Sequence, residues 1–257
     1  ALRLVADGAL DERDVDALAQ RLGIGERHLR RLFRRHLGAS PVAVAQTRRL
    51  HFAKRLIDET DLPMTEVALA SGYRSLRRFN AALREAYAMA PTALRRAARG
   101  QRGHGEASDA SDRGHLALRL AYRTPIALPP LFDFLARRAV PGVEHVGGNT
   151  YQRMLEIDDT AVRIAVVDEG TPGAITLRVP VAAAASLGRI VAAARSLFDL
   201  DADPEAIADT LGRDALLAPI LAREPGLRVP GAADGHEIAV RAVLGQQVSV
   251  AGARTPV

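Results

Sequence analysis

The sequence has 257 residues, of which 48% are hydrophobic and 25% charged, the balance of a globular protein with one or two domains. It contains no cysteine, which excludes disulfide bonds, thiol nucleophiles and thiolate metal ligands. It shows no run of about eighteen apolar residues and no signal peptide, so we expect no membrane span and a cytoplasmic location. The 7 histidines are scattered, and none has a partner at metal-ligand spacing, so we expect no metal site.

Positive charge is concentrated in the first part of the chain. Residues 1–100 hold 19 Arg and Lys against 11 Asp and Glu, a net charge of +8, whereas residues 101–257 carry a net charge of −3. A basic surface favours a polyanionic partner, because each phosphate that it neutralises releases a counterion. Solvated basic surfaces are also common, so charge alone leaves both interpretations open.

An internal repeat with an offset of about 50 residues lies in this basic part. Each copy has a short helical pattern, a glycine turn and a second helix with apolar residues at i, i+3, i+4 and i+8. The copies run from Leu18 to Pro41 and from Val67 to Pro91. The turn glycines are Gly23 and Gly72, and the apolar stripes are Leu29, Leu32, Phe33 and Leu37 in the first copy and Phe79, Ala82, Leu83 and Tyr87 in the second. The repeat predicts two helix-turn-helix units.

A connecting helix is predicted between the copies. Ser40 is a good N-cap, and Pro41 suits the first helical position. The residues that we expect to turn inward on this helix are Val44, Leu50, Ala53 and Ile57. In the second copy Ala88 stands where the first has the turn glycine Gly38, so this turn should be slightly strained.

Two such units on a stiff connecting helix resemble the AraC-type DNA-binding domain. The resemblance covers residues 1–98, with the units at about 14–37 and 63–87. It implies that each second helix enters the major groove of double-stranded DNA, the two lying about one turn, roughly 34 Å, apart on one DNA face. Because the units differ in sequence, the implied operator is asymmetric. An activator of this type also implies RNA polymerase as a partner.

The faces opposite the apolar stripes are the expected DNA-reading faces. In the first unit this face carries Arg27, Arg30, Arg31 and Arg34, and in the second it carries Leu76, Arg77, Asn80 and Arg84. Arginine can bind guanine with a fork of two hydrogen bonds, and asparagine can bind adenine in the same way. Arg34 and Arg84 lie nearer the helix ends, where phosphate contact is expected. The alternative for each arginine is a solvated or ion-paired side chain.

Residues 99–115 are rich in Gly, Ser and charge and predict a flexible tether. Beyond the tether, alternating apolar residues from Leu116 to Tyr122 predict a strand, and three β-rich runs follow at 151–157, 161–167 and 174–181. Helical stretches are expected at 130–139, 186–198, 203–212 and 236–251. The order favours an antiparallel sheet with helices on one face over residues 116–201. The acidic clusters Asp158-Asp159 and Asp199, Asp201 and Asp203 are interpreted as turn and cap residues, so no catalytic constellation appears here.

Three stretches of this half, with their order and spacing, resemble the AlkA-type alkylation-repair DNA glycosylases. They read LAYRTPIALPPLFDFLARRAVPGVEHV, SLFDLDADPEAIADTLG and PGLRVPGAADGHEIAVRAVLGQQVS. The family's sheet domain precedes an all-α core with a helix-hairpin-helix and a catalytic aspartate, which excises an alkylated base after flipping it from the duplex. The resemblance implies that Gln247 fills the gap left by the flipped base; the alternative is a residue on a helix surface.

The resemblances together predict a multidomain protein. An all-α tandem helix-turn-helix domain is followed by an α+β antiparallel-sheet domain and, over residues 202–257, by the truncated start of an all-α helix-hairpin-helix glycosylase core. Val229-Pro230-Gly231 does not continue as the family's hairpin does, so we assign no catalytic residue and expect this chain to lack glycosylase activity. The absence of an initiator Met and the apolar pattern near Val257 indicate an excerpt of a longer protein.

A regulator fused to an alkylation glycosylase resembles the Ada-type adaptive-response proteins. Those usually begin with a cysteine-bearing methyl-accepting domain that binds zinc; no cofactor is expected in this chain itself. The main interpretation is therefore a sequence-specific regulator of the alkylation response, joined to a DNA-3-methyladenine glycosylase that acts on alkylated DNA. One alternative is a pure AraC-type regulator with a C-terminal effector-binding domain. Another is a repair enzyme that uses its helix-turn-helix units only for non-specific tethering.

Overall fold

The computed structural model describes residues 1–6, 8–12, 14–101, 114–157 and 159–246. Contacts between residues divide the chain into two units. Unit 1 comprises Ala1–Gly114 and Val181–Ala192, and unit 2 comprises His115–Pro180 and Ala193–Val257. Helix α8 runs on to Gln101, three residues into the expected tether, and most of that tether lies outside the described residues. No helix among the described residues is long and apolar enough to cross a membrane.

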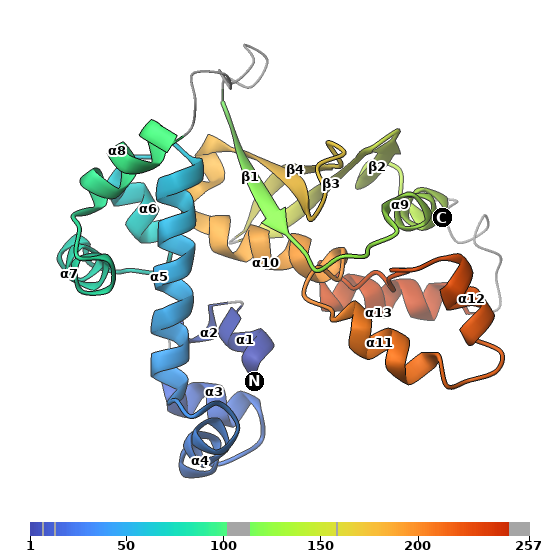
Figure 1. Ribbon diagram of the computed structural model, residues 1–257, viewed down its shortest axis with the longest axis horizontal. Coiled ribbons are helices and arrows are strands. Elements are labelled where there is room, and N and C mark those ends of the chain that lie inside the picture. Colours follow the sequence, from blue (N-terminus) through green and yellow to red (C-terminus); the bar gives the residue numbers. More distant parts are fainter. Residues whose placement is uncertain (7, 13, 102–113, 158, 247–257) are drawn as a thin grey trace. The chain divides into compact units, whose positions relative to one another are not determined.

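The first hundred residues of unit 1 fold into helices. These are α1 (Leu2–Ala6), α2 (Ala9–Glu12), α3 (Val15–Arg21), α4 (Glu26–Leu37), α5 (Pro41–Glu59), α6 (Met64–Ala70), α7 (Leu76–Tyr87) and α8 (Pro91–Gln101). The pairs α3–α4 and α6–α7 are the two helix-turn-helix units that the repeat predicts, and the long helix α5 connects them (Figure 1). A 3₁₀ helix, η2 (Val181–Ser186), and the first residues of α10 also belong to this unit.

Local capping explains where these helices begin and end. The Ser40 side chain accepts a hydrogen bond from the Ala43 backbone N–H at 3.1 Å, and Pro41 follows it, as predicted for the start of α5. Gly23 and Gly72 follow α3 and α6 with φ of +68° and +85°, a backbone conformation that a residue without a Cβ adopts most readily. The turns of both units are therefore where the sequence places them.

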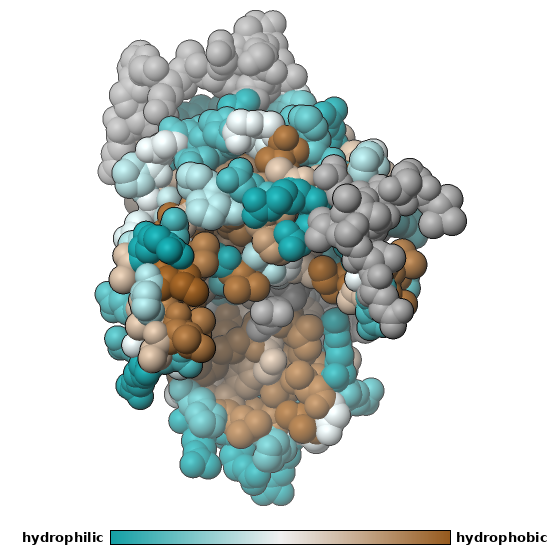
Figure 2. All heavy atoms as spheres, turned by 90° about the vertical axis from the view of Figure 1, so that its right-hand side faces the viewer, coloured by the Kyte–Doolittle hydropathy of each residue, from teal (hydrophilic) through white to brown (hydrophobic). Residues whose placement is uncertain are grey.

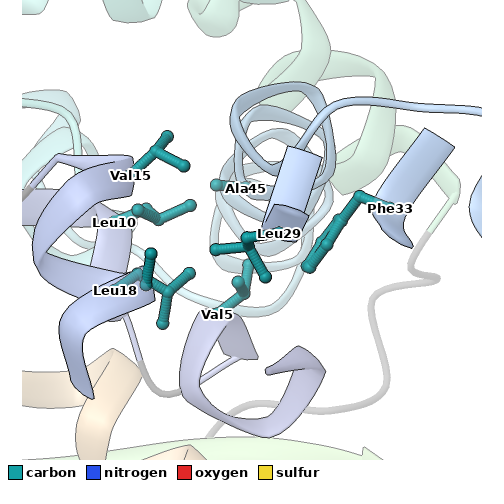
Figure 3. Packing of buried hydrophobic residues seen from close by; sticks show 8 residues of the cluster. Val5, Leu10, Val15, Leu18, Leu29, Phe33 and Ala45 are labelled. Atoms are coloured by element: carbon teal, nitrogen blue, oxygen red, sulfur yellow. The ribbon is translucent and has the colours of Figure 1, made fainter. Parts of the chain in front are cut away.

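The apolar stripes of α4 and α7 face the interior. Leu29 and Phe33 are buried with Val5, Leu10, Val15, Leu18 and Ala45 in one hydrophobic cluster (Figure 3). Phe79 and Leu83 are fully buried in the second helix-turn-helix unit. Leu37 was expected in the first stripe, but it is 44% exposed. It lies eight residues after Leu29, which places it about 80° around the helix axis from that buried residue.

Unit 2 contains one five-stranded antiparallel sheet in the order β1-β5-β4-β3-β2 (Figure 1). The strands are β1 (His115–Ala121), β2 (Glu144–Gly147), β3 (Thr150–Ile157), β4 (Thr160–Val167) and β5 (Ala174–Pro180). Strands β1, β3, β4 and β5 confirm the four strands predicted from the sequence. The edge strand β2 was not predicted, because its four residues are too few to show an alternating pattern.

The other helices are α9 (Leu128–Arg138), α10 (Leu187–Leu197), α11 (Pro204–Leu211), α12 (Ala218–Arg223) and α13 (Gly235–Leu244). Phe198, directly after α10, packs its ring against Phe132 of α9 and Tyr151 of β3, each with a centroid distance of 5.6 Å. The predicted helix 236–251 was too long: α13 ends at Leu244, where Gly245 interrupts it, and residues 247–257 lie outside the described part. Helix α12 was not predicted.

Ala88 adopts φ of +54° after α7, in the left-handed region that costs a residue with a Cβ free energy. We therefore expect Ala88→Gly to raise the free energy of unfolding of unit 1 by about 0.5–1 kcal/mol, measured by urea titration with circular dichroism. The control is Ala86→Gly at an exposed position inside α7, which should lower the free energy of unfolding by a similar amount. Equal destabilisation by both variants would contradict the assignment of strain to Ala88.

Candidate nucleic-acid interface

Helix α4 presents an arginine-rich face on the side away from its core residues. Arg27, Arg31 and Arg34 are exposed, and they lie across the helix from the buried Leu29 and Phe33. Because successive residues are about 100° apart, these three arginines point within roughly 60° of one another and of the direction opposite the buried residues. The structure thus collects the predicted first reading face on one helix surface.

Arg30 lies on the flank of this face and is held by Glu26, one turn earlier. Its Nε and Nη2 atoms donate to Glu26 Oε1 at 2.7 and 2.5 Å. Arg31 shares a hydrogen bond of 2.8 Å with His28 Nδ1. Arg30 is thus ion-paired within α4, and its side chain is 44% exposed.

Helix α7 presents the second predicted face. Arg77 and Arg84 are exposed and lie across the helix from the buried Phe79 and Leu83. The exposed Leu76 and the half-buried Asn80 lie on the flank between these two sides. Helix α7 carries three arginines and one glutamate, whereas α4 carries five arginines and one glutamate. Both faces are positive, and the first is the more strongly so. Phosphates of a nucleic acid are the natural counter-charge for such faces.

The basic residues of α5 have a different role. The Asp11 carboxylate pairs with Arg48 and Arg49 of α5, with 2.7 Å between Asp11 Oδ1 and Arg49 Nε. A Cβ on Gly72, in the turn of the second unit, would come within 2.6 Å of the same carboxylate. Asp11 therefore ties α5 to the start of the chain and excludes any larger residue at Gly72. The sequence offered no local signal for these ion pairs, because Arg48 and Arg49 follow Asp11 by 37 and 38 residues.

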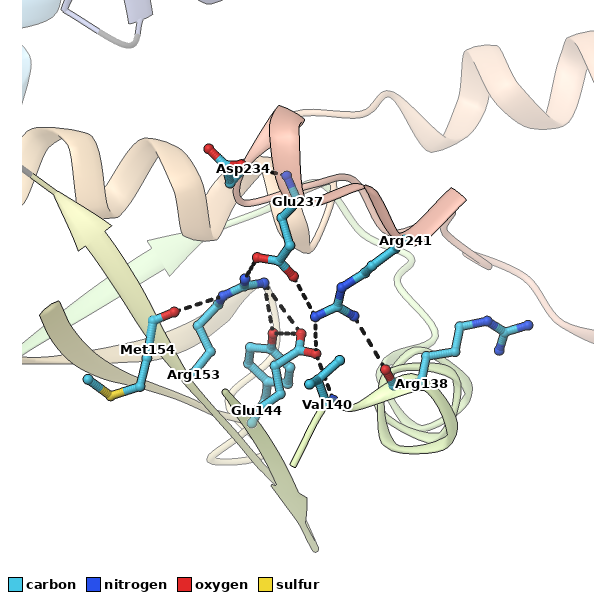
Figure 4. Close-up of polar contacts among 9 residues, drawn as sticks. Arg138, Val140, Glu144, Arg153, Met154, Asp234, Glu237 and Arg241 are labelled. Carbon is cyan, nitrogen blue, oxygen red and sulfur yellow. Dashed lines mark hydrogen bonds and ion pairs between the residues drawn. The ribbon is translucent and has the colours of Figure 1, made fainter. Parts of the chain in front are cut away.

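In unit 2 the expected DNA-contacting residue Gln247 lies outside the described residues. The helix that leads to it, α13, is joined to the sheet by a network of charged side chains (Figure 4). Arg153 of β3 is 5% exposed and pairs with Glu144 of β2 and with Glu237 of α13. Arg241 of α13 binds the other oxygen of Glu144 at 2.6 Å and also pairs with Glu237. Two arginines and two glutamates therefore neutralise one another inside unit 2.

Further hydrogen bonds complete the environment of Glu144. The Tyr151 hydroxyl donates to it at 2.6 Å and the Val140 backbone N–H at 3.2 Å. Burial by itself would raise the pKa of Glu144, but the hydrogen bonds from Tyr151, Arg241 and Val140 hold it below its ordinary value. Burial also raises the pKa of the Tyr151 hydroxyl, which therefore stays protonated as the donor. Only the spacing of Glu237 and Arg241 by four residues was visible in the sequence.

The helices α11, α12 and α13 have no buried residue, so an apolar surface of this segment remains uncovered. Figure 2 views the side on which these helices lie and shows apolar side chains gathered there. The exposed apolar residues of the segment are Leu211, Leu216, Leu217, Ile220, Leu227, Val229, Ile238, Val240, Val243 and Leu244. An apolar surface of this extent is typical of an interface with further protein.

The described part of unit 2 shows no built small-molecule or metal site. A recess between Pro125, Ile207, Leu221 and Leu227 has a volume of about 160 Å³, below the usual range for a pocket that holds an effector. No group of three His, Cys, Asp or Glu among the described residues could hold a metal ion. The effector-binding alternative thus gains no support from these residues.

The family model of the helix-turn-helix domain matches residues 18–97, and that of the AlkA N-terminal domain matches residues 117–234. The chain therefore combines an AraC-type helix-turn-helix DNA-binding domain with an AlkA N-terminal domain, in that order.

Three known proteins show how far this similarity extends. A probable bifunctional transcriptional activator/DNA repair enzyme AlkA of Mycobacterium tuberculosis is 40% identical over 255 residues, which cover 99% of this chain and 50% of that protein. DNA-3-methyladenine glycosylase 2 of Escherichia coli is 32% identical over 132 residues, 51% of this chain and 45% of that protein. The DNA-binding domain of AdpA in complex with a target DNA aligns at 34% identity and a TM-score of 0.36, covering 39% of this chain and 91% of that one. The chain thus spans about half the length of each of these two curated relatives, the M. tuberculosis protein and the E. coli glycosylase.

Glu144 gives a pH-dependent test of the network in unit 2. A carboxylate whose pKa is lowered on folding stabilises the fold above its ordinary pKa, and this stability is lost as the pH falls through the lowered value. We expect Glu144→Gln to lower the free energy of unfolding by about 3 kcal/mol at pH 7, because it removes one of the two carboxylates that pair with buried Arg153. The difference from the wild type should shrink as the pH falls through the lowered pKa.

Urea titrations at pH 7 and at successively lower pH measure both effects. Glu169→Gln is the matched control, because Glu169 pairs with Arg178 at an exposed position and should matter little at either pH. A loss that is the same at every pH would contradict the role of the ionised Glu144.

Proposed function

We propose that this chain is the DNA-binding regulatory part of a bifunctional alkylation-response protein whose other activity is that of a DNA-3-methyladenine glycosylase. The observation that carries the proposal is the order of the two matched domains in one chain, with continuous 40% identity to a bifunctional relative across both. The basic faces of α4 and α7 support the regulatory half of the proposal, because each combines exposed arginines with a residue suited to base contact.

Reading of the operator follows from the two faces. Arg27, Arg31 and Arg34 of α4, and Arg77 and Arg84 of α7, would supply phosphate contacts and guanine contacts. Arg30, Asn80 and Leu76 would contact base edges from the flanks of the same helices. Since corresponding residues differ between the helices, the operator would be asymmetric. DNA as the partner also implies a cytoplasmic location, and an activator implies contact with RNA polymerase.

The domain limits form part of the proposal. Residues 1–98 would form the DNA-binding domain, 99–115 the linker, 116–201 the AlkA-type α+β domain, and 202–257 the start of a helical glycosylase core. The uncovered apolar side chains of α11, α12 and α13 support this last part, because helices that bury no residue need further protein to pack against. In the base-excision reaction, Gln247 would fill the gap left by a flipped base. We assign no catalytic residue to this chain.

The two kinds of DNA contact predict two kinds of mutant. Arg34→Ala and Arg84→Ala should weaken binding to every duplex and each reduce the slope of log K against log salt by about 1, from a starting slope of roughly −5. Arg30→Ala and Asn80→Ala should instead relax preference at one base pair, by about 1–3 kcal/mol. Fluorescence anisotropy with specific and scrambled duplexes measures both quantities.

Arg213→Ala is the control for lost charge, because Arg213 is exposed in unit 2 and should leave binding by the helix-turn-helix units unchanged. Wild-type binding without any sequence preference would contradict the regulatory proposal and favour non-specific tethering.

The repair half of the proposal is tested with alkylated duplex DNA. The full-length gene product should release 3-methyladenine and leave abasic sites, whereas the 257-residue chain should release none. Release of labelled base and strand cleavage at abasic sites are the measurements. Absence of release by the full-length protein would refute the glycosylase proposal, and release by this chain would refute our statement that it holds no catalytic residue.

A further inference from the structure

The helices α4 and α7 differ at several equivalent positions, two of which lie next to each other on one flank. The internal repeat aligns α4 with α7 at an offset of 50 residues, so that Glu26 corresponds to Leu76 and Arg30 to Asn80. Residues four apart lie one above the other on a helix, so each of these pairs forms a patch on the same flank of its helix. The neighbouring positions Arg27 and Arg34 keep arginine in both helices, as Arg77 and Arg84. The patch is therefore one place where the two units can differ in sequence preference, beside the position where Arg31 of α4 corresponds to Ala81 of α7.

In α4 the patch holds an arginine in a fixed orientation. Glu26 Oε1 accepts hydrogen bonds from Nε and Nη2 of Arg30, so the Nη1 side of the guanidinium remains available for another partner. Both side chains line a recess of about 280 Å³ that is also bordered by Asp14, Asp16 and Arg49. A guanidinium whose one edge is already bonded has fewer orientations to lose when its other edge binds a base.

The carboxylate of Glu26 is electrostatically costly on a helix that approaches phosphates. Its position in the first turn of α4 is favoured by the helix dipole, which offers a purely structural reason for its presence. The two explanations make different predictions. A structural role leaves the discrimination between bases untouched, whereas an orienting role makes that discrimination depend on the carboxylate.

In α7 the same patch carries no charge. Leu76 is 42% exposed, and Asn80 is half-buried one turn further along the same flank. An asparagine amide can bind adenine through two hydrogen bonds, and a leucine side chain can contact the methyl group of thymine. Together they match an A·T pair as Glu26 and Arg30 match a G·C pair.

We infer that Glu26 is a positioning residue that holds Arg30 for guanine, and that Leu76 with Asn80 selects an A·T pair at the equivalent place of the second half-site. The inference rests on the proposed DNA-binding function and deepens it. It assigns part of the asymmetry of the operator to one patch on each helix, while the arginines that both helices share supply affinity to each half-site.

Glu26→Gln is the first test. It keeps the size of the side chain and removes its charge, so binding to non-specific DNA should stay equal or become tighter, while the preference for guanine over the other bases at the Arg30 position should fall by roughly fivefold or more. The matched control is Glu85→Gln, which removes the exposed carboxylate of α7 and should tighten binding to all duplexes without changing base preference. Base preference is measured by selection from a randomised duplex library and by anisotropy on single-base variants of the selected site.

Exchange of the two patches is the second test. Glu26→Leu with Arg30→Asn should replace the guanine preference in the first half-site by an A·T preference, and Leu76→Glu with Asn80→Arg should do the reverse in the second. Circular dichroism establishes that each variant is folded. Unchanged preference in folded variants would overturn the inference while leaving the DNA-binding proposal intact. A wild-type chain without sequence preference would instead refute the proposed function itself.

Discussion

Burial of the connecting helix α5 is the constraint on which the DNA-binding part depends. Ala45, near its start, belongs to the hydrophobic cluster of the first helix pair, and Phe52, Leu56 and Ile57 are buried farther along. A helix of 19 residues is about 28 Å long, close to the repeat of one DNA turn, about 34 Å. Because α5 packs against both α4 and α7, it fixes the spacing between the two helix-turn-helix units.

The core also determines which residues are left outward. Leu29 and Phe33 of α4, and Phe79 and Leu83 of α7, occupy the interior, so the arginines on the other side have no alternative to the surface. Asp11 pairs with Arg48 and Arg49 of α5 and offsets part of their positive charge, whereas the exposed arginines of α4 and α7 keep theirs. Packing and electrostatics thus act together: apolar contacts orient the helices, and charge selects the partner.

Unit 2 relies on a different kind of interaction. A closed set of buried and half-buried charges, Glu144, Arg153, Glu237 and Arg241, joins α13 to strands β2 and β3. Such a network is specific rather than strongly stabilising, because each charge gains from its partners what it loses on leaving water. Its effect is to fix the direction of the helix that leads to Gln247.

The sequence predicted those features that repeat at short range. Period-3.6 stripes placed α4 and α7, and period-2 alternation placed β1, while Ser40 and the turn glycines marked helix limits. Strand β2 was not predicted because it is short. The ion pairs of Asp11 with Arg49 and of Arg153 with Glu237 were not predicted because the partners are far apart in the sequence. Ion pairing was left open for every arginine of the predicted face of α4, and the structure shows that Arg30 pairs with Glu26 through its Nε and Nη2 atoms.

The central claim is that one rigid helix presents two basic reading faces to adjacent turns of a single duplex. Hydroxyl-radical footprinting on a selected site measures this directly. The account predicts two protected segments on the same side of the DNA, about ten base pairs apart, in one complex with a single chain. Protection confined to one turn, or two segments on opposite sides of the duplex, would contradict it.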